Sequence, residues 1–252
     1  MRIALAGKGG VGKTTISATL ARLAARQGRT VVAIDADSNP NLALALGASG
    51  APDGMPRRVV SRRFDGAALT TSVDDVVDTY GIPGPDGLRV VAMGSPAHAD
   101  EGCMCSAHAT VSALLADAGP VDVDVIVDME ASPEHLSRGT ARHVDVLLLV
   151  TEPYYRSLEA VRRLADLAAE LPIPRVGVVI SKVRSPEDAE AVRAFCDRHD
   201  LSVIGEIPWS EAAVTSDVAA RPLLDAHPDD PAVAAIGDVL RAVLTVPALE
   251  RS

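Results

Sequence analysis

Aromatic side chains are scarce in this sequence, which has one Trp, three Tyr and two Phe among 252 residues. Hydrophobic residues nevertheless make up 48% of the chain, so its core must be built mainly from Ala, Val, Leu and Ile. Basic charge is in deficit too, because 24 Lys and Arg stand against 34 Asp and Glu, a net charge of −10. Nucleic-acid binding needs a basic face, so we expect no nucleic-acid partner.

The run from Arg57 to Arg63 is a local exception to the acidic balance. A solvated loop accounts for it better than a docking patch for an acidic partner. Long apolar runs are absent, since no stretch approaches the roughly 20 residues that span a bilayer. The apolar segment before residue 7 is too short for a signal peptide. We therefore expect a cytoplasmic protein with no membrane partner.

Cysteine is rare as well, with three in the chain, too few for a disulfide framework. Two of them form the pattern Cys103-Met104-Cys105, which in a cytosolic protein is typical of a metal-binding or redox-active site. Two thiolates leave a metal half-coordinated, so a two-fold dimer that joins two such pairs would offer four sulfurs. Four thiolates suit Zn²⁺ in a tetrahedral site or Ni²⁺ in a square-planar one. Cys196, on a helical pattern next to Phe195, is expected in the core.

Two histidines and a glycine flank the cysteine pair. Gly102 allows a close backbone approach where two such pairs meet. His98 and His108 are near enough in sequence to act as secondary ligands, but a surface role is expected for each.

The most informative segment is the run Gly7-Lys8-Gly9-Gly10-Val11-Gly12-Lys13-Thr14-Thr15, which fits the phosphate-binding pattern G-x-x-x-x-G-K-[ST]. A short apolar strand precedes it and a helical pattern over 16–27 follows it, as the motif requires. Backbone N–H groups of the loop would cradle phosphate oxygens. Lys13 would reach the β- and γ-phosphates, and Thr14 would ligate Mg²⁺. The second lysine, Lys8, is not needed for this and suggests a nucleotide site that a second subunit completes.

Apolar strand patterns alternate with helical patterns along the chain. The expected strands are 2–6, 30–35, 88–92, 123–128, 144–151, 175–181 and 202–207, and the expected helices are 16–27, 73–80, 111–118, 156–171, 186–198 and 232–244. Strands that are apolar throughout and separated by helices build a parallel sheet covered on both faces. We therefore predict a single α/β domain over 1–252, a doubly wound, mainly parallel sheet with helices on both faces. The segment 50–87 is expected to be an excursion from it.

Carboxylates fall at the ends of the expected strands, where ligands bind in such sheets. Asp128 fits the residue that holds Mg²⁺ through water in phosphate-loop proteins. Asp35 and Asp37 end another strand; one could sit in the outer shell of Mg²⁺ and the other could orient the attacking water. Phosphoryl transfer needs mainly positioning and charge neutralisation, so this set of groups suits nucleotide hydrolysis.

Together these residues resemble the dimeric P-loop ATPases with a deviant Walker A motif. That family includes the septum-positioning (MinD-like) and plasmid-partitioning (ParA-like) ATPases and the nitrogenase iron protein, and Lys8 stands at its signature lysine. Within it, the chain is similar to the CooC-type carbon monoxide dehydrogenase maturation ATPases, which help to insert nickel. That narrower similarity rests on the stretches 102–105, 128–131, 134–140, 151–153 and 156–159.

The resemblance implies the P-loop NTPase fold, hydrolysis of ATP to ADP, and a role for each residue of the site. Lys8 would cross the dimer interface to the partner's phosphates. Thr14 would bind Mg²⁺ with Asp35 and Asp128 in its outer shell. Asp37 would position the hydrolytic water.

One departure from the family pattern concerns the base. Family members often carry Asn-Lys after the strand that ends near residue 180, where the amide reads adenine, and here the pair is Ser181-Lys182. A serine hydroxyl makes fewer of those hydrogen bonds, so adenine selection is expected to be less strict. Backbone groups near Pro208 are the other expected contacts to the base.

The function implied by the resemblance is that of a metallochaperone ATPase. Its ATP-dependent homodimer would bind Ni²⁺ or Zn²⁺ through Cys103 and Cys105 and help to insert nickel into a client such as carbon monoxide dehydrogenase. One alternative is a spatial-organiser ATPase that binds DNA or a membrane, although the stretch 247–252 carries no basic amphipathic helix. The other is an iron–sulfur redox ATPase. Cys103 matches one cluster cysteine of the nitrogenase iron protein, but 131–141 lacks the second; two Cys-x-Cys pairs could still hold a cluster.

Overall fold

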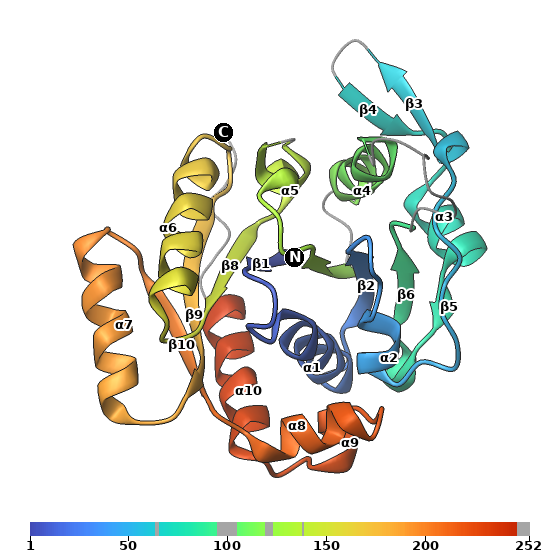
Figure 1. The fold of residues 1–252 in the computed structure, drawn as a ribbon. Coiled ribbons are helices and arrows are strands. Elements are labelled where there is room, and N and C mark those ends of the chain that lie inside the picture. The colour runs from blue at the N-terminus through green and yellow to red at the C-terminus, as the bar shows by residue number, and fades with distance from the viewer. Residues whose placement is uncertain (64–65, 95–104, 119–122, 138, 246–252) are drawn as a thin grey trace.

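The computed structural model describes residues 1–63, 66–94, 105–118, 123–137 and 139–245. Its strands are β1 (Arg2–Gly7), β2 (Thr30–Ala36), β3 (Val60–Arg63), β4 (Gly66–Leu69), β5 (Ile82–Pro83), β6 (Arg89–Ala92), β7 (Val123–Met129), β8 (Val146–Thr151), β9 (Arg175–Val183) and β10 (Val203–Pro208). Its α-helices are α1 (Lys13–Arg26), α2 (Leu42–Leu46), α3 (Val73–Tyr80), α4 (Cys105–Asp117), α5 (Glu134–Ser137), α6 (Tyr155–Ala169), α7 (Pro186–Arg198), α8 (Glu211–Val218), α9 (Leu223–Ala226) and α10 (Pro231–Leu244). Figure 1 shows their arrangement.

The centre of the fold is one sheet, which has eight strands within the described residues, in the order β10-β9-β8-β1-β7-β2-β6-β5. Neighbouring strands are parallel except for the short edge strand β5, which is antiparallel to β6. Every residue of β8 is buried, because a strand in the middle of a parallel sheet is covered on both faces. The predicted α/β class and mainly parallel sheet are confirmed.

Helices cover both faces of this sheet (Figure 1). One face packs against α1, α2 and α10, and its core is almost purely aliphatic. The other face packs against α3, α4, α6 and α7. Among the described residues, no helix has both the length and the apolarity to cross a bilayer.

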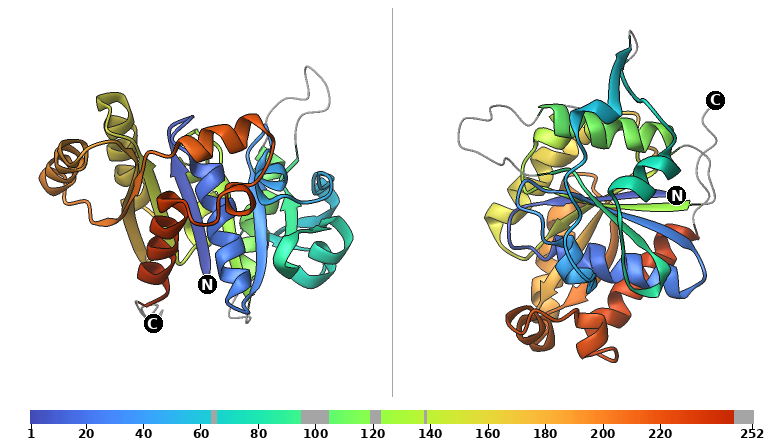
Figure 2. Two further views of the ribbon diagram at one scale, coloured as in Figure 1. Left: turned by 90° about the horizontal axis from the view of Figure 1, so that it is seen from below. Right: turned by 90° about the vertical axis from the view of Figure 1, so that its right-hand side faces the viewer.

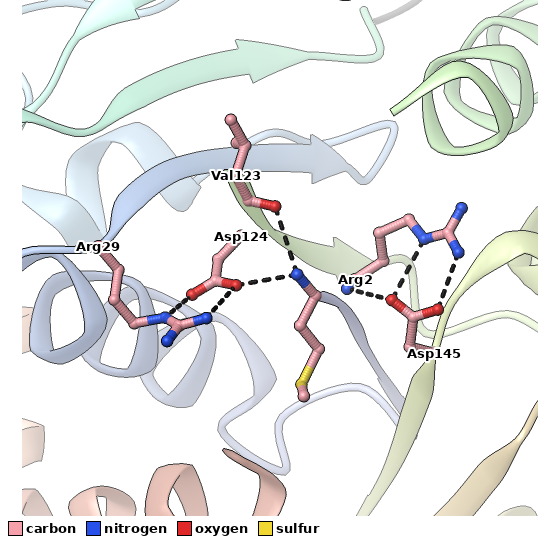
Figure 3. A network of polar contacts seen from close by, with 6 residues as sticks. Arg2, Arg29, Val123, Asp124 and Asp145 are labelled. Carbon is pink, nitrogen blue, oxygen red and sulfur yellow. Dashed lines mark hydrogen bonds and ion pairs between the residues drawn. The ribbon is translucent and has the colours of Figure 1, made fainter. Parts of the chain in front are cut away.

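Two carboxylates and the cations paired with them tie the amino ends of the central strands together (Figure 3). The carboxylate of Asp124 on β7 accepts hydrogen bonds from the Met1 amino group at 2.9 Å and from Arg29. Burial alone would raise the pKa of Asp124, but these cations outweigh it and lower that pKa. Arg2 on β1 pairs with Asp145, just before β8, at 2.8 Å. The carboxyl ends of the same strands, at the opposite edge of the sheet, carry the residues of the candidate site.

Several elements were not predicted from the sequence. The segment 50–87 contains a two-stranded antiparallel hairpin, β3–β4, which stands away from the sheet in Figures 1 and 2. The short elements α2, β5 and α9 and the helix α8 also escaped prediction. In α8 the one buried residue is Ser216, so this helix has no apolar stripe for a periodicity argument to find.

Candidate functional site

The phosphate loop follows β1 directly and ends in the first turn of α1. Gly12 precedes that helix with φ +94°, a left-handed conformation that glycine adopts without strain. At Gly7 a Cβ atom would lie 2.3 Å from the carbonyl oxygen of Val150 on β8. Glycine is therefore needed at the first position of the loop for close packing and at Gly12 for backbone conformation.

The two lysines of the loop face different surroundings. Lys13 is 7% exposed, and its Nζ donates to the carbonyls of Gly7 at 3.0 Å and Lys8 at 3.1 Å. Burial lowers the pKa of Lys13, although nearby carboxylates, Asp128 first among them, oppose that shift. The Lys8 side chain is exposed. Lys13 is thus placed to serve its own loop, whereas Lys8 is free to reach outward.

Asp35 and Asp128 lie side by side at the carboxyl ends of β2 and β7. The strand register pairs the two residues directly, so both side chains lie on the face covered by α1. Each is 2% exposed. Burial raises the pKa of Asp35 to about 6. Burial, with the neighbouring Asp35 charge, raises the pKa of Asp128 to about 7, even though Thr14 donates a hydrogen bond to it.

The loop after β2 is arranged around the Asp35 carboxylate. That carboxylate accepts the backbone N–H groups of Asp37 at 3.2 Å and Leu42 at 2.8 Å. Asp37 is half-buried, and its own carboxylate accepts the N–H of Asn39 at 2.8 Å. Asp35 therefore positions the turn that carries Asp37 toward the phosphate loop.

The donor atoms at this place fit Mg²⁺. Thr14, Asp35 and Asp128 offer oxygen ligands, which this hard cation prefers. Burial is the first cause of both raised pKa values, because it disfavours the charged form of each carboxyl group. A divalent cation bound beside them would favour the charged form again. No group of three or more His, Cys, Asp or Glu side chains in the described ranges could hold a metal unaided, so the nucleotide and water would have to complete the coordination.

Asp35 and Asp128 should make the protein less stable as the pH rises, which is the opposite of the effect of carboxyl groups whose pKa is lowered. Because the folded-state pKa values of Asp35 and Asp128 are raised, the folded protein binds more protons than the unfolded chain from about pH 4 to about pH 7. The free energy of unfolding of the nucleotide-free protein should therefore fall as pH rises through this window, by about 1.4 kcal/mol per unit for a fully shifted group. Urea unfolding at pH 5 and pH 7.5 measures it.

The Asp128→Asn variant should lose most of that slope, while Asp229→Asn, at an exposed position, should keep it. Asp124 and Asp145 have lowered pKa values, so they change the stability only below about pH 4. They therefore do not mask the fall in stability expected between pH 5 and pH 7.5. An unchanged slope in Asp128→Asn would show that the carboxyl pair is not the source.

A hollow of about 380 Å³ opens beside the phosphate loop. The loop and Asp37 line it together with Pro208, Trp209 and Asp217. Its size falls in the range of small-molecule pockets. Phosphates would lie against the loop. The predicted base contact at Pro208 stays a prediction, and this residue lines the same hollow.

The predicted base reader Ser181 is occupied elsewhere. Its hydroxyl donates to the carbonyl of Val11 at 2.7 Å and lies 3.1 Å from that of Thr151, and the side chain is 2% exposed. Ser181 thus stabilises the phosphate loop through its hydrogen bond to Val11. Adenine reading by its hydroxyl remains a prediction, but the hydroxyl's single proton is used by the main chain here.

Lys182 lies against the outer side of the same loop. Its backbone is left-handed, with φ +58°, and its Nζ donates to the Gly10 carbonyl. The Glu152 carboxylate is 3.4 Å away. Lys182 and Ser181 therefore hold two points of the phosphate loop, at Gly10 and at Val11.

Sequence reasoning missed Ser17 and Trp209. The fully buried Ser17 hydroxyl donates to Asp128 at 3.2 Å. Ser17 follows Thr14 by one helical turn, so helical spacing could have placed it on the same face. Trp209 lines the hollow and stacks under the Arg184 guanidinium at 4.3 Å, and only its being the one Trp in the chain could have drawn attention to it.

The cysteines divide into two groups. Cys103 and His98 lie outside the described residues, and Cys105 is the first residue of α4, although its side chain is not described. Cys196 is 1% exposed in the core, as predicted, and burial raises the pKa of its thiol to about 11. The expectation of a surface role for His108 was wrong, because this side chain is 3% exposed. It packs inward from α4, a contact that its position beside the cysteines in sequence did not reveal.

Comparison with known proteins adds an independent finding. The model of the CobQ/CobB/MinD/ParA nucleotide-binding domain matches residues 3–223. The carbon monoxide dehydrogenase accessory protein CooC of Rhodospirillum rubrum is 36% identical over 242 residues, 90% of this chain and 91% of that protein. An ATP-binding protein of Methanocaldococcus jannaschii is 35% identical over 88% of this chain and 91% of its own. A ParA family ATPase of Chlorobium tepidum has the same fold, with a TM-score of 0.72 at 22% identity over 96% of this chain and 97% of that one.

Proposed function

Because the chain belongs to the CobQ/CobB/MinD/ParA nucleotide-binding family and is an ATPase, we propose that it uses ATP to drive metal delivery to a metalloenzyme such as carbon monoxide dehydrogenase. The observation that carries this proposal is the 36% identity, over nine-tenths of the chain, to a carbon monoxide dehydrogenase accessory protein. The cargo would be Ni²⁺ or Zn²⁺, held by Cys103 and Cys105.

The hydrolysis step follows from the arrangement at the strand ends. Water attacks the γ-phosphorus of ATP, the bond to the bridging oxygen breaks, and ADP leaves with its electron pair. Asp37, held by the Asp35 carboxylate, orients that water. Lys13 and the start of α1 offset the phosphate charge. Mg²⁺ bound by Thr14, with Asp35 and Asp128 behind water, would neutralise charge on the phosphate oxygens.

A second copy of the chain would complete this site. The large apolar side chains that are exposed within the described residues are Leu44, Tyr154, Tyr155, Trp209, Val214 and Val218. Each lines one of the hollows around the nucleotide site, or adjoins in sequence a residue that does. Exposed apolar groups gathered on one face are typical of an interface. The exposed Lys8 directly precedes Gly9, which lines the hollow at the phosphate loop. We propose that a homodimer forms across this face when ATP is bound.

The dimer would also assemble the metal site. Each chain offers two thiolates, Cys103 and Cys105, and two chains offer the four sulfurs that Zn²⁺ or square-planar Ni²⁺ takes. Hydrolysis would then weaken the dimer, separate the two cysteine pairs and release the metal. In this proposal the nucleotide controls when the cargo is held.

Metal analysis combined with sizing tests the proposal. With ATP and Ni²⁺ or Zn²⁺, the wild-type protein should elute as a dimer with about one metal ion per dimer. Cys103→Ser and Cys105→Ser should abolish stoichiometric metal binding and leave the nucleotide affinity of the metal-free protein unchanged. The buried Cys196 supplies a matched control, because Cys196→Ser should keep the metal.

The alternatives give different results in the same samples. Unchanged metal content in Cys103→Ser would refute the cysteine site. A brown protein after anaerobic purification, with visible absorption that Cys103→Ser removes, would identify an iron–sulfur cluster instead of a Ni²⁺ or Zn²⁺ cargo.

A further inference from the structure

His135, on the short helix α5, holds the end of strand β2. Its side chain is 1% exposed, and its Nε2 lies 2.7 Å from the carbonyl oxygen of Ala36. A carbonyl oxygen can only accept, so Nε2 carries the proton and donates it. A hydrogen bond of this length in a buried place is costly to leave unmade.

Ala36, whose carbonyl accepts the His135 hydrogen bond, directly precedes Asp37, the candidate catalytic aspartate. Ala36 ends β2, and Asp37 follows it. The same Ala36 carbonyl also accepts the N–H of Glu130 at 3.4 Å, and Ala36 is in register with Met129. His135 therefore fastens the turn that carries Asp37 to the segment that follows Asp128. A change in either loop must move the other or break this contact.

A second histidine joins this point to helix α4. The rings of His108 and His135 meet edge to face, with centroids 4.3 Å apart and planes at 67°. His108 is 3% exposed and comes from the first turn of α4, three residues after Cys105. Further along, α4 buries Val111, Leu114 and Leu115 in the core. A packed helix moves as a unit because close-packed interiors do not deform continuously.

We propose that His135 and His108 are positioning residues that couple the placement of Asp37 to the start of α4. Nucleotide binding would rearrange the loops after Asp37 and Asp128, shift His135 and, through the ring contact, shift α4. Such coupling is reciprocal, so a ligand at the start of α4 would change nucleotide affinity by the same factor. This inference rests on the proposed function where it takes Cys105 to be part of the metal site.

The test reads the start of α4 without any metal. Metal-free protein is treated with iodoacetamide, with and without a non-hydrolysable ATP analogue, and alkylation of Cys105 is followed by mass spectrometry. In the wild-type protein the two rates should differ by at least about fivefold, the lower range of allosteric coupling. In His135→Ala that ratio should approach one, and in His135→Gln it should be retained, because the amide of Gln can still donate to Ala36.

Three controls separate coupling from loss of structure. Leu136→Ala changes a neighbour that is equally buried but lacks the polar contact, so it should lower stability and keep the ratio. His108→Phe, which preserves the ring, should keep it, whereas His108→Ala should lose it. Cys196, buried and with a raised thiol pKa, serves as the internal unreactive reference.

Turnover supplies a readout that a merely structural role would not move. Since His135 acts through Asp37, His135→Ala should lower kcat for ATP hydrolysis by about tenfold or more with KM little changed, and His135→Gln should recover it. A wild-type alkylation ratio of one, or a full ratio and full kcat in His135→Ala, would overturn the inference. Absence of metal binding by the wild-type protein would instead refute the proposed function. The alkylation ratio of Cys105 and the kcat for ATP hydrolysis would still test the coupling.

Discussion

Mixing the Lys8→Ala and Asp37→Ala variants is expected to restore about a quarter of wild-type ATP hydrolysis, because random exchange in a two-fold dimer makes half the dimers mixed and gives each one complete site. Alone, Lys8→Ala should lose about 10³-fold in kcat, the lower range for removing a charge supplied across an interface. Asp37→Ala, which loses the group that orients the water, should be similarly impaired. In the mixed dimer, the Lys8→Ala chain keeps Asp37 and receives Lys8 from its partner. The rescue is expected because the Lys8 side chain is exposed and we propose that it acts in the partner's site.

The matched control uses the other lysine of the loop. Lys13 is buried and donates to carbonyls of its own loop, so Lys13→Ala mixed with Asp37→Ala should yield no complete site and no rescue. The phosphate-release assay is run after subunit exchange, with native mass spectrometry to count mixed dimers. If mixed dimers form and Lys8→Ala is still not rescued, Lys8 acts within its own chain.

The Gly7→Ala variant should lose at least about 3 kcal/mol of unfolding free energy, which places it among the severe single substitutions. A Cβ at this position would meet Val150 at 2.3 Å from the carbonyl oxygen and 3.2 Å from the carbonyl carbon. Neither side can give way, because Val150 is main chain in the fully buried strand β8 and Gly7 ends the neighbouring strand β1. Urea unfolding followed by circular dichroism measures the loss.

The neighbouring Gly9→Ala variant is the control for this effect. A Cβ there would meet the Cβ of Ala131 at 3.6 Å, an ordinary contact, and Gly9 is not among the described glycines with positive φ. Its stability should stay within about 1 kcal/mol of wild type. Equal stability of the two variants would show that the end of β1 does not press against β8.

Helix positions were predictable where the chain carries readable start signals. The bounds predicted for α3 and α7 agree with the structure at both ends. In each, the preceding serine accepts a backbone N–H three residues on, Ser72 from Asp75 and Ser185 from Asp188. A serine before an apolar periodic stretch is a recognisable cap. For α6, where the preceding residue Tyr154 makes no such side-chain bond, the predicted bounds were off at both ends.

Elements without an apolar pattern of their own were not predicted, even where a cap is present: Ser210 caps α8 by accepting the N–H of Ala213 at 2.9 Å. Helix α8 buries Ser216 and no apolar residue, and β5 is two residues long. These elements exist because neighbours already in place offer them partners, β6 for β5 and α9 for α8. Their stability is tertiary, so no window of sequence contains it.

For the candidate site, residue types and their order were readable, but several partnerships were not. The loop 7–15 and the carboxylates at 35, 37 and 128 follow from a motif and from strand ends. The sequence did not reveal that Ser181 would bond to Val11, or that His108 would be buried against His135. Each of these contacts joins segments from 27 to 170 residues apart, and such pairings depend on how the helices pack.

The sequence by itself determined the parallel α/β sheet, the phosphate loop at its first turn and the carboxylates beside it, because each depends on local periodicity, on glycine geometry or on a strand ending where a charge begins. Only the tertiary structure decided which polar groups are buried and which side chains are in contact. Register set Asp35 directly beside Asp128, and burial raised the pKa values of both. Packing of α4 against α5 set the His108–His135 contact within reach of Asp37. Burial and long-range contact are properties of the whole folded chain, which no short stretch of residues encodes alone.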